Sequence, residues 1–293
     1  MEHIMESLKN EQSLKGLGTG TDPLPASQQE YMQIKCDMYN DAPGDLNLRD
    51  GINCERCKNR GHFWIVTKNE LFGCYAETQI PCRCEKTRSV IRKLNKAGLQ
   101  NVVRDYTFDK YKTPDKWQES VKQKAMQFCQ DDQNRWFFIG GQSGAGKSHL
   151  ATAIAVHYIK QGMDVEYMQW LEDIKRIKSF TMDGEEYEKL MNKFKEAPVL
   201  YIDDLFKEGN GVGSDDKPFT QTDVRCTFEI INYRYNNPQL VTIISSEKTI
   251  PDMVCIDEAF AGRIAERTQG AGYCINLGRD IKKNWRLKGM VTL

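Results

Sequence analysis

A glycine-rich stretch in the middle of the chain constrains the fold more than any other feature. Its sequence, GGQSGAGKS at residues 140–148, matches the phosphate-loop pattern G-x-x-x-x-G-K-[ST] at every fixed position. An apolar segment precedes it at 136–140, and a helical pattern follows from Lys147 to Lys160. Such a loop presents backbone N–H groups and the positive end of a helix to phosphates, so we expect a nucleotide site here.

The loop pattern assigns roles to individual residues. Lys147 supplies a positive charge for the β- and γ-phosphates, and the Ser148 hydroxyl completes the coordination shell of Mg²⁺. The expected cofactors are therefore ATP or ADP together with magnesium. The residues predicted to bind the nucleotide are Gly141, Gln142, Ser143, Gly144, Ala145, Gly146, Lys147, Ser148 and His149.

A second motif, VLYIDD, ends an apolar segment with Asp203 and Asp204, 56 residues after Lys147. Asp203 is placed to hold magnesium through water, and Asp204 to orient or deprotonate the attacking water. Many phosphate-loop ATPases carry glutamate at the second position, so the aspartate leaves the catalytic rate open. The next apolar segment ends in Ser245 and Ser246. We expect the Ser246 hydroxyl beside the γ-phosphate, with an ordinary polar strand end as the alternative.

The C-terminal part of the chain alternates between strand and helix patterns. This order predicts an α/β fold with a mainly parallel sheet of five strands and helices on both faces. Strands are expected at 136–140, 165–168, 198–203, 240–246 and 273–277, and helices at 118–129, 147–160, 170–178, 185–195, 222–236 and 258–266.

Five of the ten cysteines fall between residues 54 and 84, as a C-x-x-C pair, a C-x-C pair and one cysteine between them. Two close pairs can present four thiolates tetrahedrally, as structural zinc requires, and a small hairpin is expected between them. Cys74, and less so His62, stay open as substitutes for one ligand. A redox C-x-x-C is the rival interpretation, disfavoured because no βαβ frame surrounds it. The predicted zinc ligands are Cys54, Cys57, Cys82 and Cys84.

The N-terminal region is expected to be less regular. An apolar helix is predicted near Ile4 to Leu8, and residues 21–50, with several Pro, Asn and Asp, indicate a loop or a loosely ordered arm. The stretch DYTFDKYKTPDKW, residues 105–117, is interpreted as a linker. The predicted domains are an N-terminal partner-binding region at 1–104, with its zinc module at 51–84, and an ATPase domain at 105–293.

Basic and acidic side chains balance at 41 each, so contact with nucleic acid must come from local patches. Residues 83–104 carry seven basic side chains against one acidic, which suits phosphate contact or a solvated helix face equally. The stretch 170–180 mixes aromatic and basic side chains, a combination typical of single-strand binding. The basic segment 278–289 is interpreted as a solvated tail that Trp285 anchors to the sheet. The residues that define the second patch are Trp170, Lys175, Arg176, Lys178 and Phe180.

No apolar run approaches the roughly 18 residues that a membrane-spanning helix needs, and the N-terminus lacks the apolar core of a secretory signal. We therefore expect a cytoplasmic location, no membrane partner and reduced cysteines. The cysteines outside the cluster are expected to be small core residues. They are Cys36, Cys129, Cys226, Cys255 and Cys274.

Four segments together resemble the AAA+ ATPases of the DnaC/IstB family, and most of all its bacterial and phage-encoded replicative helicase loaders. They are GGQSGAGKSHLATAIA, VLYIDDLFK, FEIINYRYNNPQLVTIISSE and AGRIAERT, within roughly residues 105–280. All phosphate-loop proteins share the first motifs, whereas the third and fourth segments are more selective. The resemblance implies nucleotide binding by Gly144, Gly146, Lys147 and Ser148, an acidic pair at Asp203 and Asp204, and an arginine finger at Arg263 or Arg267.

The resemblance also implies how the site is completed. Arg263 and Arg267, four apart on one face of a short helix, are candidates to reach the nucleotide of a neighbouring subunit in an ATP-dependent homo-oligomer. Ordinary surface arginines are the alternative. Complete AAA+ proteins carry a helical lid with a further arginine, but only 16 residues follow YCINL, so no lid is expected, as is common in this family.

By the same resemblance we expect a loader that binds a hexameric replicative DNA helicase through its N-terminal region and delivers it to single-stranded DNA. A transposition helper of the same family is the first alternative. A nucleotide-binding zinc adaptor with little hydrolysis is the second. A small-molecule kinase is disfavoured because no acceptor pocket or lid is recognisable in the sequence.

Overall fold

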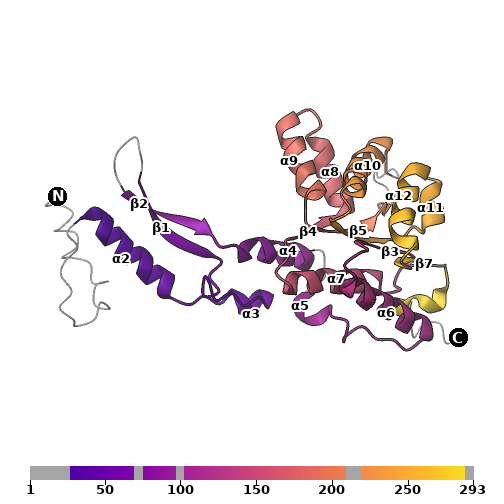
Figure 1. The fold of residues 1–293 in the computed structure, drawn as a ribbon, viewed down its shortest axis with the longest axis horizontal. Helices are drawn as coiled ribbons and strands as arrows, with labels where there is room; N and C mark the ends of the chain where they lie inside the picture. The colour runs from indigo at the N-terminus through magenta and orange to yellow at the C-terminus, as the bar shows by residue number, and fades with distance from the viewer. Residues whose placement is uncertain (1–26, 69–74, 97–101, 209–218, 288–293) are drawn as a thin grey trace. The chain divides into compact units, whose positions relative to one another are not determined.

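The computed structural model describes residues 27–68, 75–96, 102–208 and 219–287 (Figure 1). Its contacts divide the chain into two compact units, residues 1–43 with 62–80, and residues 44–61 with 81–293. The expected helix near Ile4 to Leu8 lies outside the described residues, and the functional division at residue 104 stays a prediction. Among the helices that the structure describes, none is both long and apolar enough to cross a membrane.

The first unit combines helix α2 (Gln28–Asp41) with a two-stranded sheet formed by β1 (His62–Lys68) and β2 (Tyr75–Pro81). Asn40 fixes the helix to the sheet, because its side-chain amide donates to the Trp64 carbonyl at 2.7 Å and accepts from the Trp64 N–H at 3.0 Å. Lys35 adds an ion pair with Glu77 at 2.8 Å. β1 and β2 form the small hairpin expected between the two cysteine pairs.

The prediction of a loop or loose arm at residues 21–50 is wrong, because α2 and the short α3 (Leu46–Asp50) occupy much of it. Ser27 begins α2 with a reciprocal cap, in which Glu30 N–H donates to the Ser27 hydroxyl and Ser27 N–H donates to the Glu30 carboxylate. Pro43, which suggested a loop, follows just after the helix has ended, a position where proline is common.

The second unit contains a five-stranded sheet in the order β4-β5-β6-β3-β7, and every pairing in it is parallel. This confirms the predicted fold class. Because all strands run the same way, their carboxyl ends meet at one edge of the sheet, where ligands bind in open α/β folds. The strands are β3 (Trp136–Gly141), β4 (Val165–Gln169), β5 (Val199–Leu205), β6 (Val241–Ser246) and β7 (Cys274–Leu277).

Strand side chains alternate between two cores, one on each face of the sheet. Phe137 and Ile139 of β3 pack into the first core, whereas Trp136 and Phe138 pack into the second. All six strand positions of β3 are buried, as expected for a central strand covered on both faces.

Helices cover both faces, as predicted. The first core includes side chains from α4 (Cys84–Lys96), α6 (Lys116–Gln130) and α7 (Lys147–Lys160). The second includes side chains from α8 (Trp170–Ser179), α9 (Gly184–Lys195), α10 (Gln221–Asn236), α11 (Ile250–Val254) and α12 (Glu258–Gln269). Short elements complete the described chain: α5 (Val102–Asp105), η2 (Ile281–Lys283) and η3 (Trp285–Leu287).

Candidate functional site

The phosphate loop joins the carboxyl end of β3 to the first turn of α7, as the sequence predicts. Gly141, Gly144 and Gly146 have backbone φ angles of 112°, 72° and 83°, which side chains rarely tolerate. A Cβ at Gly141 would also lie 1.9 Å from the carbonyl oxygen of Leu277 on the neighbouring strand. Glycine is therefore required where the loop leaves the sheet, and the loop ends at the electropositive terminus of α7.

Lys147 is almost fully buried, at 6% exposure. Its ammonium donates to the carbonyl oxygens of Gly141 and Gln142, both at 2.9 Å, so the side chain folds back along its own loop. Burial lowers the pKa of Lys147, while the negative charges of Glu247 and Asp204 oppose this shift. A phosphate would satisfy this buried cation better than two neutral carbonyls do.

Asp203 accepts hydrogen bonds from hydroxyl groups of four side chains. Ser148 donates at 3.2 Å and Ser245 at 2.5 Å. Tyr201 donates at 2.8 Å and Tyr167 at 3.0 Å. Burial and the charge of Asp203 raise the pKa of both tyrosines above its ordinary value, so the phenols stay protonated and donate. The Asp203 carboxylate and the Ser148 hydroxyl are hard oxygen donors side by side, and they fit Mg²⁺.

Asp204 lies next to the last residue of β5 and has a left-handed backbone, at a φ of 55°. Its N–H donates to the Ser245 hydroxyl at 3.2 Å, and its carboxylate pairs with Lys207 at 2.6 Å. Asp204 and Lys207 line the same pocket as Glu247. The second acidic residue therefore faces the candidate nucleotide site, but in this conformation Lys207 neutralises it.

The structure does not bring Ser246 to the site. The side chain is fully buried, and its hydroxyl donates to the Leu205 carbonyl at 2.6 Å and accepts from the Lys248 N–H at 2.9 Å. Successive strand residues point to opposite faces, so Ser245 is the serine that meets Asp203. The expectation that the Ser246 hydroxyl lies beside the γ-phosphate is corrected on this ground.

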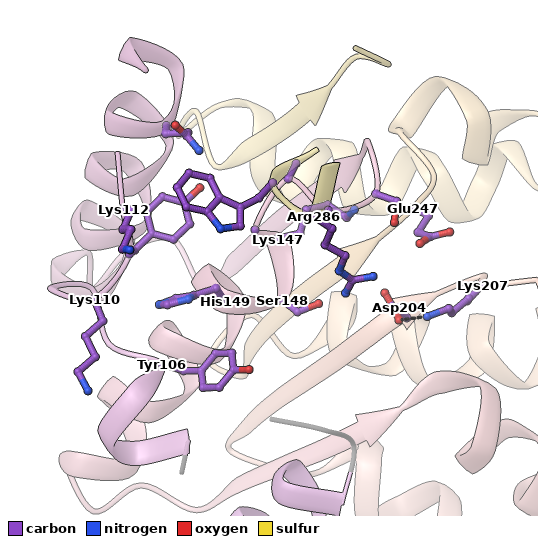
Figure 2. A pocket seen from close by; sticks show the side chains of 17 residues that line it. Tyr106, Lys110, Lys112, Lys147, Ser148, His149, Asp204, Lys207, Glu247 and Arg286 are labelled. Atoms are coloured by element: carbon purple, nitrogen blue, oxygen red, sulfur yellow. Dashed lines mark hydrogen bonds and ion pairs between the residues drawn. The ribbon is translucent and has the colours of Figure 1, made fainter. Parts of the chain in front are cut away.

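A pocket of about 440 Å³ opens beside the phosphate loop (Figure 2). This volume suits a small-molecule ligand. The predicted residues that line it are Ser143, Gly144, Ala145, Gly146, Lys147, Ser148, His149 and Asp204. Of the predicted loop residues, Gly141 and Gln142 do not line the pocket. Their carbonyl oxygens instead accept hydrogen bonds from Lys147, which does line it.

Part of the pocket comes from the segment 105–117, which the sequence suggested was a linker. Tyr111 is buried, and its ring lies 5.3 Å from that of His149, while the Tyr106 ring lies 5.1 Å from His149 on another side. The His149 ring is also held by the Thr107 carbonyl at 3.1 Å, and burial lowers its pKa. The prediction of a linker is therefore wrong, and the aromatic residues in DYTFDKY were the signal that it overlooked.

The described C-terminal segment, residues 278–287, supplies another wall. Trp285 donates its backbone N–H to the Gly144 carbonyl at 2.8 Å, and the Trp285 and Arg286 side chains line the pocket. The Lys112 ammonium lies 6.0 Å from the Trp285 ring centre. Most of this segment is exposed, as expected for a solvated tail, but backbone contacts to the loop, which the sequence does not reveal, hold it in place.

The two candidate finger residues lie on α12, and neither lines the pocket of its own chain. The Arg263 guanidinium lies 4.6 Å from the Phe228 ring centre and donates to Asn232 at 2.9 Å. The Arg267 guanidinium lies 4.7 Å from the Tyr235 ring centre. Aromatic side chains of α10 therefore hold both arginines away from the nucleotide site of the same chain.

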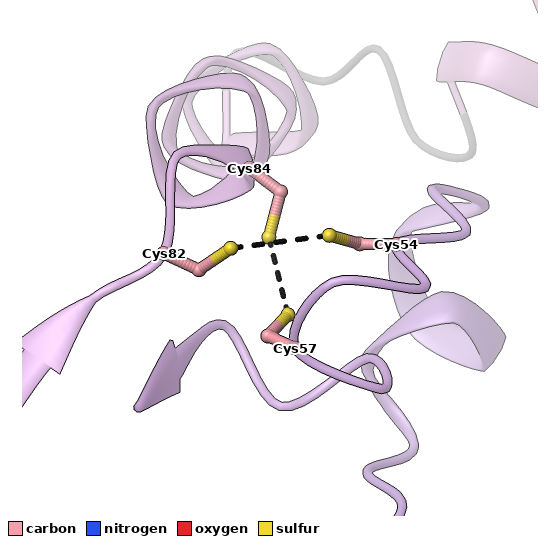
Figure 3. Close-up of side chains that lie close together, drawn as sticks. All are labelled: Cys54, Cys57, Cys82 and Cys84. Carbon is pink, nitrogen blue, oxygen red and sulfur yellow. Dashed lines mark hydrogen bonds between the residues drawn. The ribbon is translucent and has the colours of Figure 1, made fainter. Parts of the chain in front are cut away.

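The four predicted cysteines of the N-terminal half converge in the second unit (Figure 3). Their sulfurs all lie within 4.8 Å of one another, with Cys54 and Cys82 at 3.9 Å and Cys57 and Cys84 at 3.6 Å. A tetrahedral zinc with Zn–S bonds of about 2.3 Å requires S–S separations of about 3.8 Å. The cluster is thus compatible with zinc. His62 is not part of it, and Cys74 lies outside the described residues.

Positive charge and N–H groups point at this cysteine cluster. The Gly61 N–H donates to the Cys57 sulfur at 3.3 Å, and the Arg88 Nε donates to the Cys84 sulfur at 3.4 Å. Arg88 is fully buried and also pairs with Asp50 at 2.5 Å. Such donors favour thiolates, which is the ionisation state that binds metal.

The basic patches predicted for nucleic acid are mostly engaged within the protein. In the segment 83–104, Arg88 is buried, and Lys86 pairs with Asp164 at 3.4 Å. Trp170 is also buried and donates its indole N–H to Thr227 at 2.9 Å, so it is not available for stacking with a base.

On the same helix, Lys175 and Arg176 are exposed, whereas Lys178 pairs with Asp223 at 2.9 Å. Phe180 is half-buried. DNA contact by this helix stays a prediction.

The expectation of small core cysteines outside the cluster holds for Cys36 and Cys226, and it is wrong for the exposed Cys255.

The sequence model of the family described as IstB-like ATP binding protein matches residues 76–275. The chain belongs to this family. Among IstB-like and related proteins, it is 32% identical over 248 residues to the phage-like element PBSX protein XkdC of Bacillus subtilis, an alignment that covers 81% of this chain and 87% of XkdC.

The chain is 26% identical over 117 residues to the replicative helicase loader DnaC of Escherichia coli, which covers 39% of this chain and 48% of DnaC. The crystal structure of the DnaC helicase loader is 24% identical and has a TM-score of 0.44, covering 60% of this chain and 96% of that one. Membership of the IstB-like family confirms the resemblance expected from the four sequence segments.

Proposed function

We propose that this IstB-like protein is an ATP-driven loader, which binds a hexameric replicative DNA helicase and delivers it to single-stranded DNA. The observation that carries the proposal is the assembled set of Lys147, Ser148 and Asp203 in a member of an ATP-binding family. A replicative helicase is proposed as the partner because the chain is similar to a protein named as a replicative helicase loader. Its similarity to a phage-like element protein is compatible with a loader function.

In this proposal the chain hydrolyses ATP. Lys147 turns from its loop carbonyls to the β- and γ-phosphates. Ser148 and Asp203 would hold Mg²⁺, and the ion would supply neutralisation of the charge on the phosphates. Asp204 orients the water whose oxygen attacks the γ-phosphorus as the bond to ADP breaks. Because Lys207 holds Asp204 at 2.6 Å, this ion pair must open or shift before Asp204 can act on water.

The arginine finger in this proposal acts between subunits of a homo-oligomer. Arg263 and Arg267 are absent from the pocket lining of their own chain, and α10 holds them elsewhere, which supports action on a neighbour's nucleotide. ATP would thus favour association, and hydrolysis would release the helicase. Contact with single-stranded DNA is assigned to Lys175 and Arg176, which are exposed on α8.

The N-terminal region in this proposal binds the helicase, and a zinc ion at the four-cysteine cluster would hold Cys54 and Cys57 against the start of α4 within the second unit. Zinc here is structural, because four sulfur ligands leave no open coordination position. Its partners in the chain are the cysteine thiolates and the Arg88 side chain that donates to Cys84.

ATP turnover with and without single-stranded DNA and a cognate helicase tests the proposal. Lys147→Ala should abolish turnover, whereas Lys160→Ala, an exposed lysine at the other end of the same helix, should retain it. Stimulation of the wild-type protein by either ligand supports a loader cycle. Nucleotide binding with turnover at the level of Lys147→Ala under every condition favours instead the zinc adaptor with little hydrolysis, an alternative that the Asp204–Lys207 ion pair supports.

The transposition helper remains the alternative within the family, because the matching family model itself carries the IstB name. A pull-down that compares a hexameric helicase with a transposase separates the two functions. Retention of the helicase alone supports the loader, and retention of the transposase alone supports the helper.

A further inference from the structure

The four hydroxyl groups that donate to Asp203 are of two kinds. Ser148 is half-buried and lines the pocket. The other three donors are at most 1% exposed, and they are Tyr167, Tyr201 and Ser245. A hydroxyl that lines the pocket can turn from Asp203 toward a ligand, whereas a buried donor would lose its hydrogen bond without gaining one to water.

The geometry of the sheet brings the two tyrosines to Asp203. Tyr201 precedes Asp203 by two residues on β5, so both side chains point to the same face. Tyr167 of β4 is the register partner of Tyr201, and their ring centres lie 5.3 Å apart. The Tyr201 hydroxyl donates to Asp203 Oδ1 and the Tyr167 hydroxyl to Oδ2. The pair therefore contacts both carboxylate oxygens from the interior of the fold.

Contacts to both oxygens restrict rotation of the Asp203 carboxylate. Its Oδ1 accepts from Tyr201, Ser245 and Ser148, although a carboxylate oxygen offers only about two lone-pair sites. The Ser148 contact is the longest of these three, at 3.2 Å, and it is the one beside the pocket. Ser148 can therefore leave Asp203 for a metal ion while the tyrosines keep the carboxylate in place.

We propose that Tyr167 and Tyr201 are positioning residues for magnesium, which hold the Asp203 carboxylate in the orientation that accepts the ion together with Ser148. This inference rests on the proposed magnesium site and deepens it. The tyrosines act through Asp203 and do not touch the ion themselves. Hydrogen-bond partners of metal ligands fix the orientation of those ligands, and their removal commonly weakens metal binding about ten- to hundredfold.

The test compares equilibrium binding of a non-hydrolysable ATP analogue in the presence of magnesium and in the presence of EDTA. It uses the wild-type protein, Tyr167→Phe and Tyr201→Phe, because phenylalanine keeps the ring in the core and removes only the donor. We expect each variant to bind the analogue about tenfold more weakly with magnesium, and to change by less than about twofold in EDTA. A loss confined to the magnesium condition is not expected of a residue that only supports the fold.

Tyr273→Phe is the matched control. The Tyr273 side chain is buried in the same core, and its hydroxyl donates to a different carboxylate, that of Asp131, at 2.9 Å. Neither Tyr273 nor Asp131 lines the pocket. This variant should bind the analogue as the wild type does in both conditions. Thermal unfolding of all three variants verifies that each one is folded at the temperature of the binding measurement.

Equal weakening with magnesium and in EDTA, or wild-type binding in both conditions, would overturn the positioning role. Asp203→Asn separates this failure from failure of the proposed metal site. If Asp203→Asn loses the effect of magnesium on affinity and both tyrosine variants keep it, the metal site stands and the inference falls. If Asp203→Asn also keeps the full effect of magnesium, the proposed metal site falls and the inference falls with it.

Discussion

The hydroxyl of Ser148, in the first turn of α7, donates a hydrogen bond to the carboxylate of Asp203 at the end of β5, across 3.2 Å. The two residues are 55 positions apart in the chain, and β6 lies between β5 and β3, the strand that precedes the phosphate loop. This hydrogen bond brings the hydroxyl that follows the phosphate loop next to the first aspartate of the acidic motif. This point is where the proposed site holds magnesium.

Changing either residue should remove a magnesium contact and slow turnover. We expect Asp203→Asn and Ser148→Ala to lower kcat about hundredfold or more. The reason is that a bound metal stabilises the charge of the transition state by several kcal/mol. Steady-state turnover at increasing magnesium measures this. Ser179→Ala, an exposed serine at the end of α8, is the control and should behave as wild type. Full turnover by Asp203→Asn would contradict the proposed metal site.

The trans arginine can be tested by mixing inactive subunits. Arg263→Ala or Arg267→Ala should keep a nucleotide site but deprive its neighbour of the finger, with a loss of about a thousandfold in kcat. Lys147→Ala should lack the site but keep the finger. A mixture of Lys147→Ala with the correct arginine variant should regain turnover that neither shows alone. If an arginine variant is inactive and no mixture regains turnover, that arginine does not act between subunits.

The buried pair of Arg88 with Asp50 should contribute strongly to stability. Removing the carboxylate in Asp50→Ala leaves a fully buried guanidinium without its counter-ion, at a cost of about 3–5 kcal/mol in the free energy of unfolding. The matched control is Asp45→Ala, which breaks the exposed pair with Arg49 and should change stability little. Denaturant unfolding measures both, and equal losses for the two variants would contradict this interpretation.

Metal removal should affect more than the cysteine cluster. Cys84 begins α4, and Val90 and Leu94 of that helix pack in the same core as Phe137 of the central strand. We expect the purified protein to contain a single zinc ion per chain, and Cys84→Ser to lose it. The variant should also unfold several degrees lower, at about 2–4 °C per kcal/mol lost.

Elemental analysis and calorimetry provide the two readouts. Cys255→Ser is the control, because its thiol is exposed and lies outside the cluster. Wild-type protein without zinc would reject the metal assignment. Loss of zinc with an unchanged unfolding temperature would instead show that the metal does not support the core through α4.

Much of the ATPase fold was predictable because its signals are local. Strong apolar segments indicated all five strands, and the phosphate-loop pattern identified the residues of the loop directly from the sequence. The roles of Ser245 and Ser246 could not be assigned from sequence, because which of two adjacent residues faces a site depends on strand register. Tyr106, Tyr111 and Arg286 were missed for a different reason. They reach the pocket through contacts distant in sequence, and no spacing within their own segments predicts such contacts.

ATP-driven delivery of a helicase to DNA can be measured as unwinding on a closed circle of single-stranded DNA. The strand annealed to the circle carries no single-stranded tail, so the substrate offers the hexameric helicase no free single-stranded end to thread onto. We predict that wild-type protein with ATP increases displacement of the annealed strand, and that Lys147→Ala does not. Equal displacement with wild-type protein, with Lys147→Ala and with no added protein would contradict the loader account.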